Sequence, residues 1–316
     1  MRSAQKRRTQ KSKIKNKIKN FLTYSFFAVV VALFIANFFS LNIIEYSFAL
    51  AKSGGVVDFK NDEKFAIALI SSNSLNEIKN LSILVFDKKG NSFSKFSIDL
   101  GTKILVGSEE IVASDLLTKI SKSSKSELES VLESNFGMEF GGVFSLNISQ
   151  YNDYLGIVSG IGSVLDLAKI SEIPGANVRD SYLMYSFTSG IEIKDRREFQ
   201  VKSLASFDKE VRDIYLDSVI GKEALSITVV NATSVNGLAK NFSRKILNSG
   251  GRVVDITSSD TSEEKSFIIY KENTETLKML SNYLGITKLV SSDEIGLKYP
   301  EIVKSDIVVV VGLDKK

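Results

Sequence analysis

The chain has 316 residues, 43% of them hydrophobic and 25% charged, a globular composition with room for two domains. It contains neither cysteine nor histidine, which excludes disulfides, thiolate and imidazole metal sites, cysteine nucleophiles and a histidine general base. The net charge of +4 is uneven: residues 1–20 hold nine Lys and Arg and no acid, and the remainder holds 32 bases against 37 acids. A nucleic-acid partner would depend on this basic tail alone, and we expect none.

An uncharged segment of 24 residues, 21–44, follows the basic tail. A helix of about 20 apolar residues crosses a bilayer, so the segment predicts one transmembrane anchor. Because the cations precede it, the positive-inside rule leaves the N-terminus in the cytoplasm and the body outside. The predicted localisation is that of a single-pass cell-membrane protein. A cleaved signal peptide is the alternative, since Ala49-Leu50-Ala51 matches a cleavage site, although the apolar run exceeds the usual length of roughly 7–15 residues.

Residues 45–62, with Ser53-Gly54-Gly55, predict a linker, and a first extracytoplasmic domain is expected over 63–216. Hydrophobic periodicity and turn residues set its elements. They are, in chain order, strands at 65–70, 81–86 and 93–98, helical structure over 108–135, a strand at 143–148, a helix at 151–161 and a charged helix over 195–216. The turn Asp87–Asn91 makes the second and third strands a hairpin. Ser124 is the expected cap of a helix that stops at Gly137.

A second, smaller domain is predicted over 225–316. Its expected elements are strands at 225–230, 253–256, 266–270 and 307–311, with helices marked by Leu238–Ile246 and Leu277–Leu284. The order β-α-β-β-α-β is the split βαβ pattern of ferredoxin-like folds, with both helices on one face of the sheet. The predicted class is therefore α+β, with an α/β domain followed by this ferredoxin-like domain.

Four stretches of this second domain match a known pattern. They are Asn231-Ala232-Thr233-Ser234-Val235-Asn236-Gly237-Leu238-Ala239, Ile268-Ile269-Tyr270, Leu284-Gly285 and the ending Asp306–Asp314. They resemble the LytR C-terminal domain of bacterial cell-envelope proteins, with Ala232 where that family usually has glycine. The resemblance implies a cell-envelope protein.

Residues 63–216 resemble a shortened LytR-CpsA-Psr domain, through Ile83–Ile98, Leu128–Val164 and Arg196–Leu204. That family is similar to phosphotransferases that move undecaprenyl-pyrophosphate-linked glycopolymers onto peptidoglycan. The family's pyrophosphate-binding arginine falls on Leu100, which cannot make charge-assisted bonds to phosphate. We therefore expect a degenerate, non-catalytic domain.

Two groups of site residues follow. Asp195, Arg196 and Arg197 are candidate catalytic residues, with Mg²⁺ as cofactor, only if a divergent transferase activity remains; the alternative is a solvated helix face. Asn231, Thr233, Asn236 and Gly237 are candidate binding residues in a strand–loop–helix segment. Their alternative role is a self-closed turn with Asn236 as helix cap. No other cofactor and no metal site is expected, because acidic pairs such as Glu263-Glu264 have the pattern of solvated residues.

The sequence thus predicts a membrane-anchored envelope protein that presents its C-terminal domain to peptidoglycan or to another envelope protein. The alternative is a glycopolymer–peptidoglycan phosphotransferase.

Overall fold

A computed structural model describes residues 64–316 except for 108, 121–124, 164–165, 171–172, 174–175, 216–217, 296–297 and 316. The chain divides into two compact units, Met1–Gly54 and Gly55–Lys316, and the description below concerns the second. The predicted tail, anchor and linker, and the predicted cap Ser124, lie outside the described residues. Within them, no helix combines the length and the apolar character needed to cross a membrane.

The first sheet has five strands in the order β6-β1-β2-β3-β7. Their bounds are β1 Lys64–Ser72, β2 Ile78–Asp87, β3 Ser92–Ile98, β6 Gly142–Leu146 and β7 Arg196–Val201. The strands β1, β2 and β3 are antiparallel neighbours, while β6 pairs parallel to β1 and β7 parallel to β3. The β2–β3 hairpin confirms the turn predicted at Asp87–Asn91.

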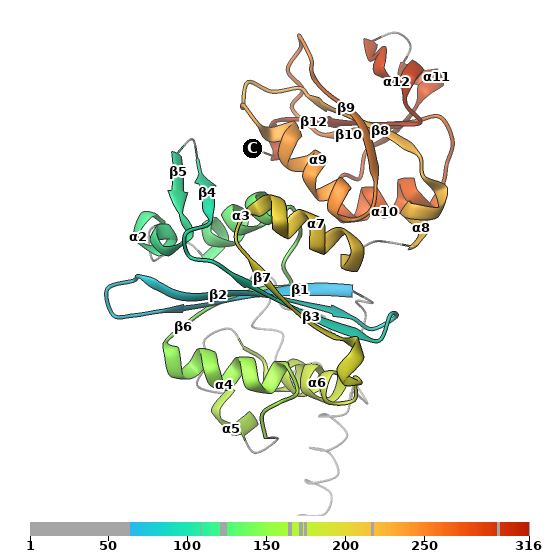
Figure 1. The fold of residues 1–316 in the computed structure, drawn as a ribbon. Helices are drawn as coiled ribbons and strands as arrows, with labels where there is room; N and C mark the ends of the chain where they lie inside the picture. The colour runs from blue at the N-terminus through green and yellow to red at the C-terminus, as the bar shows by residue number, and fades with distance from the viewer. Residues whose placement is uncertain are drawn as a thin grey trace, which may run out of the picture. The chain divides into compact units, whose positions relative to one another are not determined.

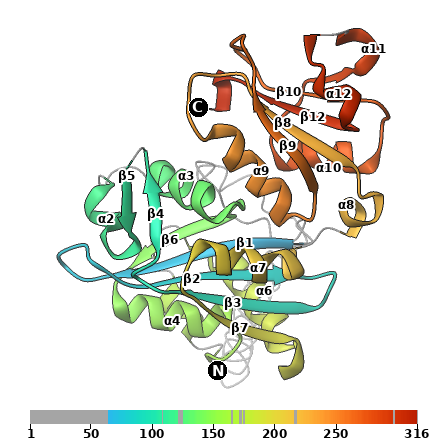
Figure 2. The same ribbon diagram turned by 45° about the horizontal axis from the view of Figure 1, so that its top comes forward.

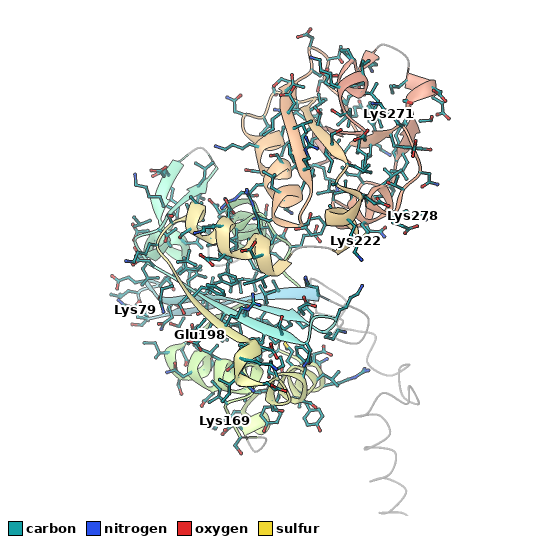
Figure 3. All side chains as sticks on the ribbon, turned by 45° about the vertical axis from the view of Figure 1, so that its right-hand side comes forward. Lys79, Lys169, Glu198, Lys222, Lys271 and Lys278 are labelled. Carbon is teal, nitrogen blue, oxygen red and sulfur yellow. The ribbon has the colours of Figure 1, made fainter. Side chains whose placement is uncertain are left out.

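Helices cover both faces of this sheet, which makes three layers (Figure 1). One face carries α4 (Ile148–Val158), α5 (Leu167–Ile170) and α6 (Val178–Ser189), packed on a core that includes Ile67, Leu84 and Tyr154. The other carries α2 (Leu116–Lys119), α3 (Lys125–Phe136) and α7 (Leu204–Tyr215), packed on Ile83, Phe96 and Phe207. The central strands are apolar on both sides because both sides are buried. Lys169, labelled in Figure 3, joins α5 to Asp153 of α4 by an ion pair of 3.3 Å.

Two predictions in this region were wrong. Glu109–Val112 forms β5, which pairs antiparallel with β4 (Lys103–Val106), so helix is absent until after the short 3-10 turn at Ala113–Asp115. Arg196–Val201 forms strand β7, and the helix predicted from 195 begins at Leu204. Phe199 and Val201 lie two residues apart, so they share one strand face and pack on the core there. Pairing with β3 outweighs the local helical pattern; Glu198 of β7, labelled in Figure 3, also reaches Lys95 of β3 at 3.7 Å.

The second sheet has the order β11-β10-β12-β8-β9. Its strands are β8 Ser226–Asn231, β9 Arg252–Ser258, β10 Phe267–Tyr270, β11 Leu289–Ser291 and β12 Ile307–Val311. The predicted strand at 307–311 is confirmed residue for residue. Strand β8 pairs parallel with both β9 and β12, whereas β10 pairs antiparallel with β12 and parallel with β11.

This topology contradicts the ferredoxin-like prediction. A split βαβ unit places another strand between its two parallel strands, but here β8 and β9 are direct neighbours. Helix α9 (Leu238–Asn248) connects them and packs against both (Figure 2). The last strand, β12, then occupies the free side of β8. The chain remains a mixed α and β protein.

Helices also lie on both faces of the second sheet. On one face, α9 and α10 (Glu275–Tyr283) pack with Ile220 of α8 (Ser218–Glu223), as the prediction of two helices on one face requires. On the other face, Tyr299 and Ile302, around α12 (Glu301–Lys304), cover Val308 and Val310. Strand β11, α11 (Ser292–Ile295) and α12 were not predicted, because each has only three or four residues.

Candidate functional site

The loop after β8 is held by its own side chains. Asn231 is only 8% exposed. Its Nδ2 donates to the Val235 carbonyl at 2.8 Å, and its Oδ1 accepts from the Thr233 amide at 3.1 Å and hydroxyl at 2.7 Å. The Thr233 hydroxyl in turn accepts from the Val235 amide at 3.1 Å. The polar groups of Asn231 and Thr233 therefore close the turn, as an Asx-type motif does.

The start of helix α9 differs from the prediction. Gly237, at φ 84°, occupies the N-cap position, and no side chain caps the helix there. Asn236 is thus not the cap; its side chain is exposed. A left-handed backbone at this position favours glycine, which explains why the chain needs Gly237 between the loop and the helix. Of the four candidate binding residues, Asn236 is the one whose side chain faces solvent without being used by the loop.

Backbone bonds tie this loop to two others at the carboxyl edge of β8, β9 and β12. The Ala232 amide donates to the Val311 carbonyl at 3.0 Å, and the Glu263 amide donates to the Ala232 carbonyl at 2.9 Å. The Leu313 amide then donates to the Glu263 carbonyl at 2.9 Å. Ala232 itself is buried against Val230 and its neighbours, so the residue that replaces the usual glycine fills part of the core. The three loops form one rigid edge, at the position where open α/β sheets commonly bind ligands.

Glu263 is the residue at this edge that sequence reasoning misjudged. It is half-buried, and its Oε1 accepts from Lys298 Nζ at 2.6 Å and from the Tyr299 hydroxyl at 2.8 Å. The hydrogen bond from Lys298 lowers the pKa of the Glu263 carboxyl, and burial raises the pKa of Tyr299 to about 12. Nothing in the sequence signals this cluster, because Glu263 and Tyr299 are brought together by tertiary structure alone.

The candidate catalytic residues do not form one site. Arg196 donates to three backbone carbonyls: Nε to Ile191 at 3.2 Å, Nη1 to Ser159 at 3.2 Å, and Nη2 to Thr188. These carbonyls lie at the C-terminal ends of α4 and α6, where cations complement unbonded carbonyls and the helix dipole.

Arg197 is exposed and is adjacent to Arg196 in the same strand, so the two side chains leave opposite faces of β7. Asp195 precedes them in the 3-10 turn η4 (Ile193–Asp195). Leu100, where the sequence resemblance leads one to expect a phosphate-binding arginine, packs partly buried against the core of the first sheet. In this arrangement the two arginines cannot bind the same pyrophosphate group.

A cavity of about 270 Å³ lies within the Gly55–Lys316 unit, between α3 and α9. Its lining includes Glu133, Glu139, Lys245, Lys315 and Phe242. Burial raises the pKa of Glu139, and Glu133 adds to this effect while Lys245 and Lys315 oppose it. Glu139 keeps much of its surface exposed, so solvent screens this effect on its pKa. Lys245 pairs with Glu133 at 3.3 Å, and the cavity therefore balances two carboxylates with two ammonium groups.

Polar bonds flank this cavity. Arg244 of α9 binds Asp208 of α7 through Nε at 2.9 Å and donates to the Asn135 carbonyl at the end of α3. Asn248 donates to the Phe136 carbonyl at 3.0 Å. The cavity therefore lies within a polar contact that α9 makes with α3 and α7. Across the described portion of the chain, no group of three or more acidic side chains could hold a metal ion.

Comparison with known proteins identifies the C-terminal region. Residues 224–314 match the family model LytR_C, described as LytR cell envelope-related transcriptional attenuator. These residues are a LytR_C domain, and the resemblance predicted from the four sequence stretches is confirmed. A comparison with curated proteins finds no match.

Among solved structures, the transcriptional regulator yvhJ from Bacillus subtilis is similar at 13% identity and a TM-score of 0.38, over 48% of this chain and 96% of that chain. Lin1025 from Listeria innocua is similar at 15% identity and a TM-score of 0.25, over 72% of this chain and all of its own. The LytR-CPS2A-psr family protein YwtF (TagT), with bound octaprenyl pyrophosphate lipid, is similar at 12% identity and a TM-score of 0.26, over 74% and 98% of the two chains.

Proposed function

We propose that this chain, with its LytR_C domain at 224–314, is a membrane-anchored protein of the bacterial cell envelope that binds the cell wall or another envelope component without catalysing a reaction. The LytR_C match is the observation that carries the proposal. The uncharged segment 21–44 after a basic tail supports the anchor and, by the positive-inside rule, supports a position of residues 45–316 outside the cytoplasm.

The rigid carboxyl edge of the second sheet supports a binding role. The bonds of Asn231 and Thr233 hold the loop backbone, while Ser234 and Asn236 remain exposed beside it. Exposed hydroxyl and amide groups on a preorganised backbone lose little conformational freedom when they bind. They suit a polar, hydroxyl-rich partner such as a wall glycan, which offers both donors and acceptors.

The positions of three residues in the first domain support the proposal that it does not catalyse a reaction. Arg196 is bound to helix-terminal carbonyls, and Arg197 leaves the opposite face of the strand. Phosphoryl transfer depends on several cations or metal ions gathered on the transferring group. Leu100 adds an apolar side chain where the related transferases have an arginine.

Retention on isolated peptidoglycan tests the proposal. The full chain in detergent should co-sediment with peptidoglycan, and the double variant Ser234→Ala/Asn236→Ala should be retained several-fold less, about 1 kcal/mol of lost hydrogen bonding. Gln200→Ala, which changes an exposed amide on β7, is the matched control and should bind as the parent does. Retention of the parent no greater than that of an unrelated protein would refute wall binding.

The phosphotransferase alternative has its own test. A polyprenyl pyrophosphate-linked glycan is incubated with the full chain and Mg²⁺, and pyrophosphate cleavage is followed. Cleavage that Arg197→Ala abolishes would replace the proposal with the transferase.

A further inference from the structure

The start of the described chain and several turns lie together at one end of the first sheet. Lys64 opens β1 opposite Asp87, the last residue of β2, and Asp87 lies opposite Ser92, the first residue of β3. Phe93 is in turn paired with Arg196, the first residue of β7. This Lys64 end of the first sheet therefore contains the start of β1, the β2–β3 turn and the start of β7.

Two helices finish at the same end. Strand β6 runs parallel to β1, so α4, which follows β6, returns toward the Lys64 end. Arg196 confirms this placement, because its guanidinium reaches both Ser159, directly after α4, and Thr188 in the last turn of α6. One side chain thus fixes the loop after α4 next to the loop after α6.

Each of these loops exposes an isoleucine. Ile161 is 74% exposed and Ile193 is 89% exposed, and they are the two most exposed large hydrophobic side chains of the described residues. Single exposed apolar residues are ordinary, but these two come from separate loops that one arginine holds together. Because both side chains lie at the Lys64 end, we consider them together as a candidate contact surface.

The charge around the pair is net positive. Apart from Arg196, which is bound to backbone carbonyls, the turn 87–91 and the segment 192–197 contain four cations and three acids: Lys88, Lys89, Lys194 and Arg197 against Asp87, Glu192 and Asp195. Apolar side chains flanked by Lys and Arg suit the interface of a bilayer that contains anionic lipids.

The length of the chain before Lys64 indicates that the partner of this surface is a membrane. Residues 45–63 separate the uncharged segment from Lys64, a stretch of 19 residues. As a flexible chain it spans about 25 Å on average, and at full extension roughly 65 Å. A tether of this length lets the Lys64 end reach the surface of any bilayer that holds residues 21–44.

We propose that the Lys64 end of the first sheet rests on the membrane, with Ile161 and Ile193 inserted among the lipid headgroups and the flanking cations facing anionic lipid. The proposal rests on the membrane anchor of the proposed function. It orients the three-layer domain, so that the β1–β2 turn at the opposite end points away from the bilayer.

Single-cysteine labelling can test this orientation, because the natural chain has no cysteine. The full chain carrying Ile161→Cys, Ile193→Cys or Leu75→Cys is labelled with a fluorophore and reconstituted in vesicles of phosphatidylcholine and phosphatidylglycerol. A fraction of the lipid carries a headgroup spin label as quencher. Leu75 is the matched control: it is 71% exposed and lies in the β1–β2 turn, about 27 Å away along β1.

We expect quenching at positions 161 and 193 to exceed that at 75 on the order of twofold or more, since only the former reach the headgroup layer. Ile161→Ser should reduce the quenching at 193, and Ile193→Ser that at 161. Equal quenching at 193 and 75 in vesicles that retain the chain would overturn this inference and leave the anchor intact. Failure of the chain to float with vesicles would overturn the anchor and, with it, the inference.

Discussion

The two five-stranded sheets use their polar residues in opposite ways. In the first, Arg196 directs its donors inward, to the carbonyls that end α4 and α6. In the second, the side chains of Asn231 and Thr233 bond to their own loop, and Ser234 and Asn236 are exposed beside it. In one sheet a charged residue that was a catalytic candidate is thus bound to backbone carbonyls of the fold, while in the other a short polar loop exposes groups to solvent. The sequence alone does not show whether a polar side chain will bond within the fold or remain exposed to solvent.

The largest expected effect is that of Arg196→Ala. It removes three hydrogen bonds to helix ends and should lower the free energy of unfolding by about 2–4 kcal/mol. Urea unfolding followed by circular dichroism measures the change. Arg197→Ala is the paired control and should change stability by less than about 0.5 kcal/mol. Equal effects of the two substitutions would contradict the separation of their roles.

The second sheet offers a smaller contrast of the same kind. Asn231→Ala leaves the Val235 carbonyl and the Thr233 amide without their partner and should cost about 1–3 kcal/mol. Asn236→Ala should cost almost nothing, because Asn236 is exposed and does not cap α9. Amide hydrogen exchange of residues 232–237 is the direct measurement. Unchanged exchange in Asn231→Ala would mean that the backbone alone holds the loop.

The smallest effect concerns pH. The Lys298 hydrogen bond lowers the pKa of Glu263 below its usual 4.5. A depressed carboxyl pKa contributes stability that is complete above about pH 4.5 and is lost as the pH falls through the lower pKa of the folded protein. The parent should therefore lose more stability on acidification through this range than Glu263→Gln does. Thermal unfolding from pH 6 to pH 3 tests this, and parallel curves for the two proteins would rule out the contribution.

Much of the fold could be predicted from the sequence. Continuous apolar runs locate β1, β2 and β12, and Gly137, at φ 60°, ends α3 as its position suggested. Strand pairing could not be predicted, because the order β-α-β-β-α-β fits two topologies. The two strands joined by the first helix can be direct neighbours, or another strand can lie between them. The helical pattern over 195–216 failed for a similar reason: β3 offers Arg196–Val201 a partner that the local sequence does not reveal.

The candidate site was predictable to a similar extent. The ability of Asn231 to close its own turn follows from residue chemistry, and the structure confirms it. The assignment of Asn236 as cap was wrong, because Gly237 in a left-handed conformation takes that place. The cluster of Glu263, Lys298 and Tyr299 depends on contacts between distant segments, which no local pattern encodes.

The placement of β12 has a consequence for how the LytR_C domain is made. Residues 307–311 lie in the middle of the second sheet, between β8 and β10, although they are the last strand to be synthesised. The first strand of the domain has its partner on this side only when residue 311 is available. Folding of the domain must therefore wait for synthesis of this segment, and the unfinished sheet, with an uncovered strand edge, is the state that a chaperone or protease would meet.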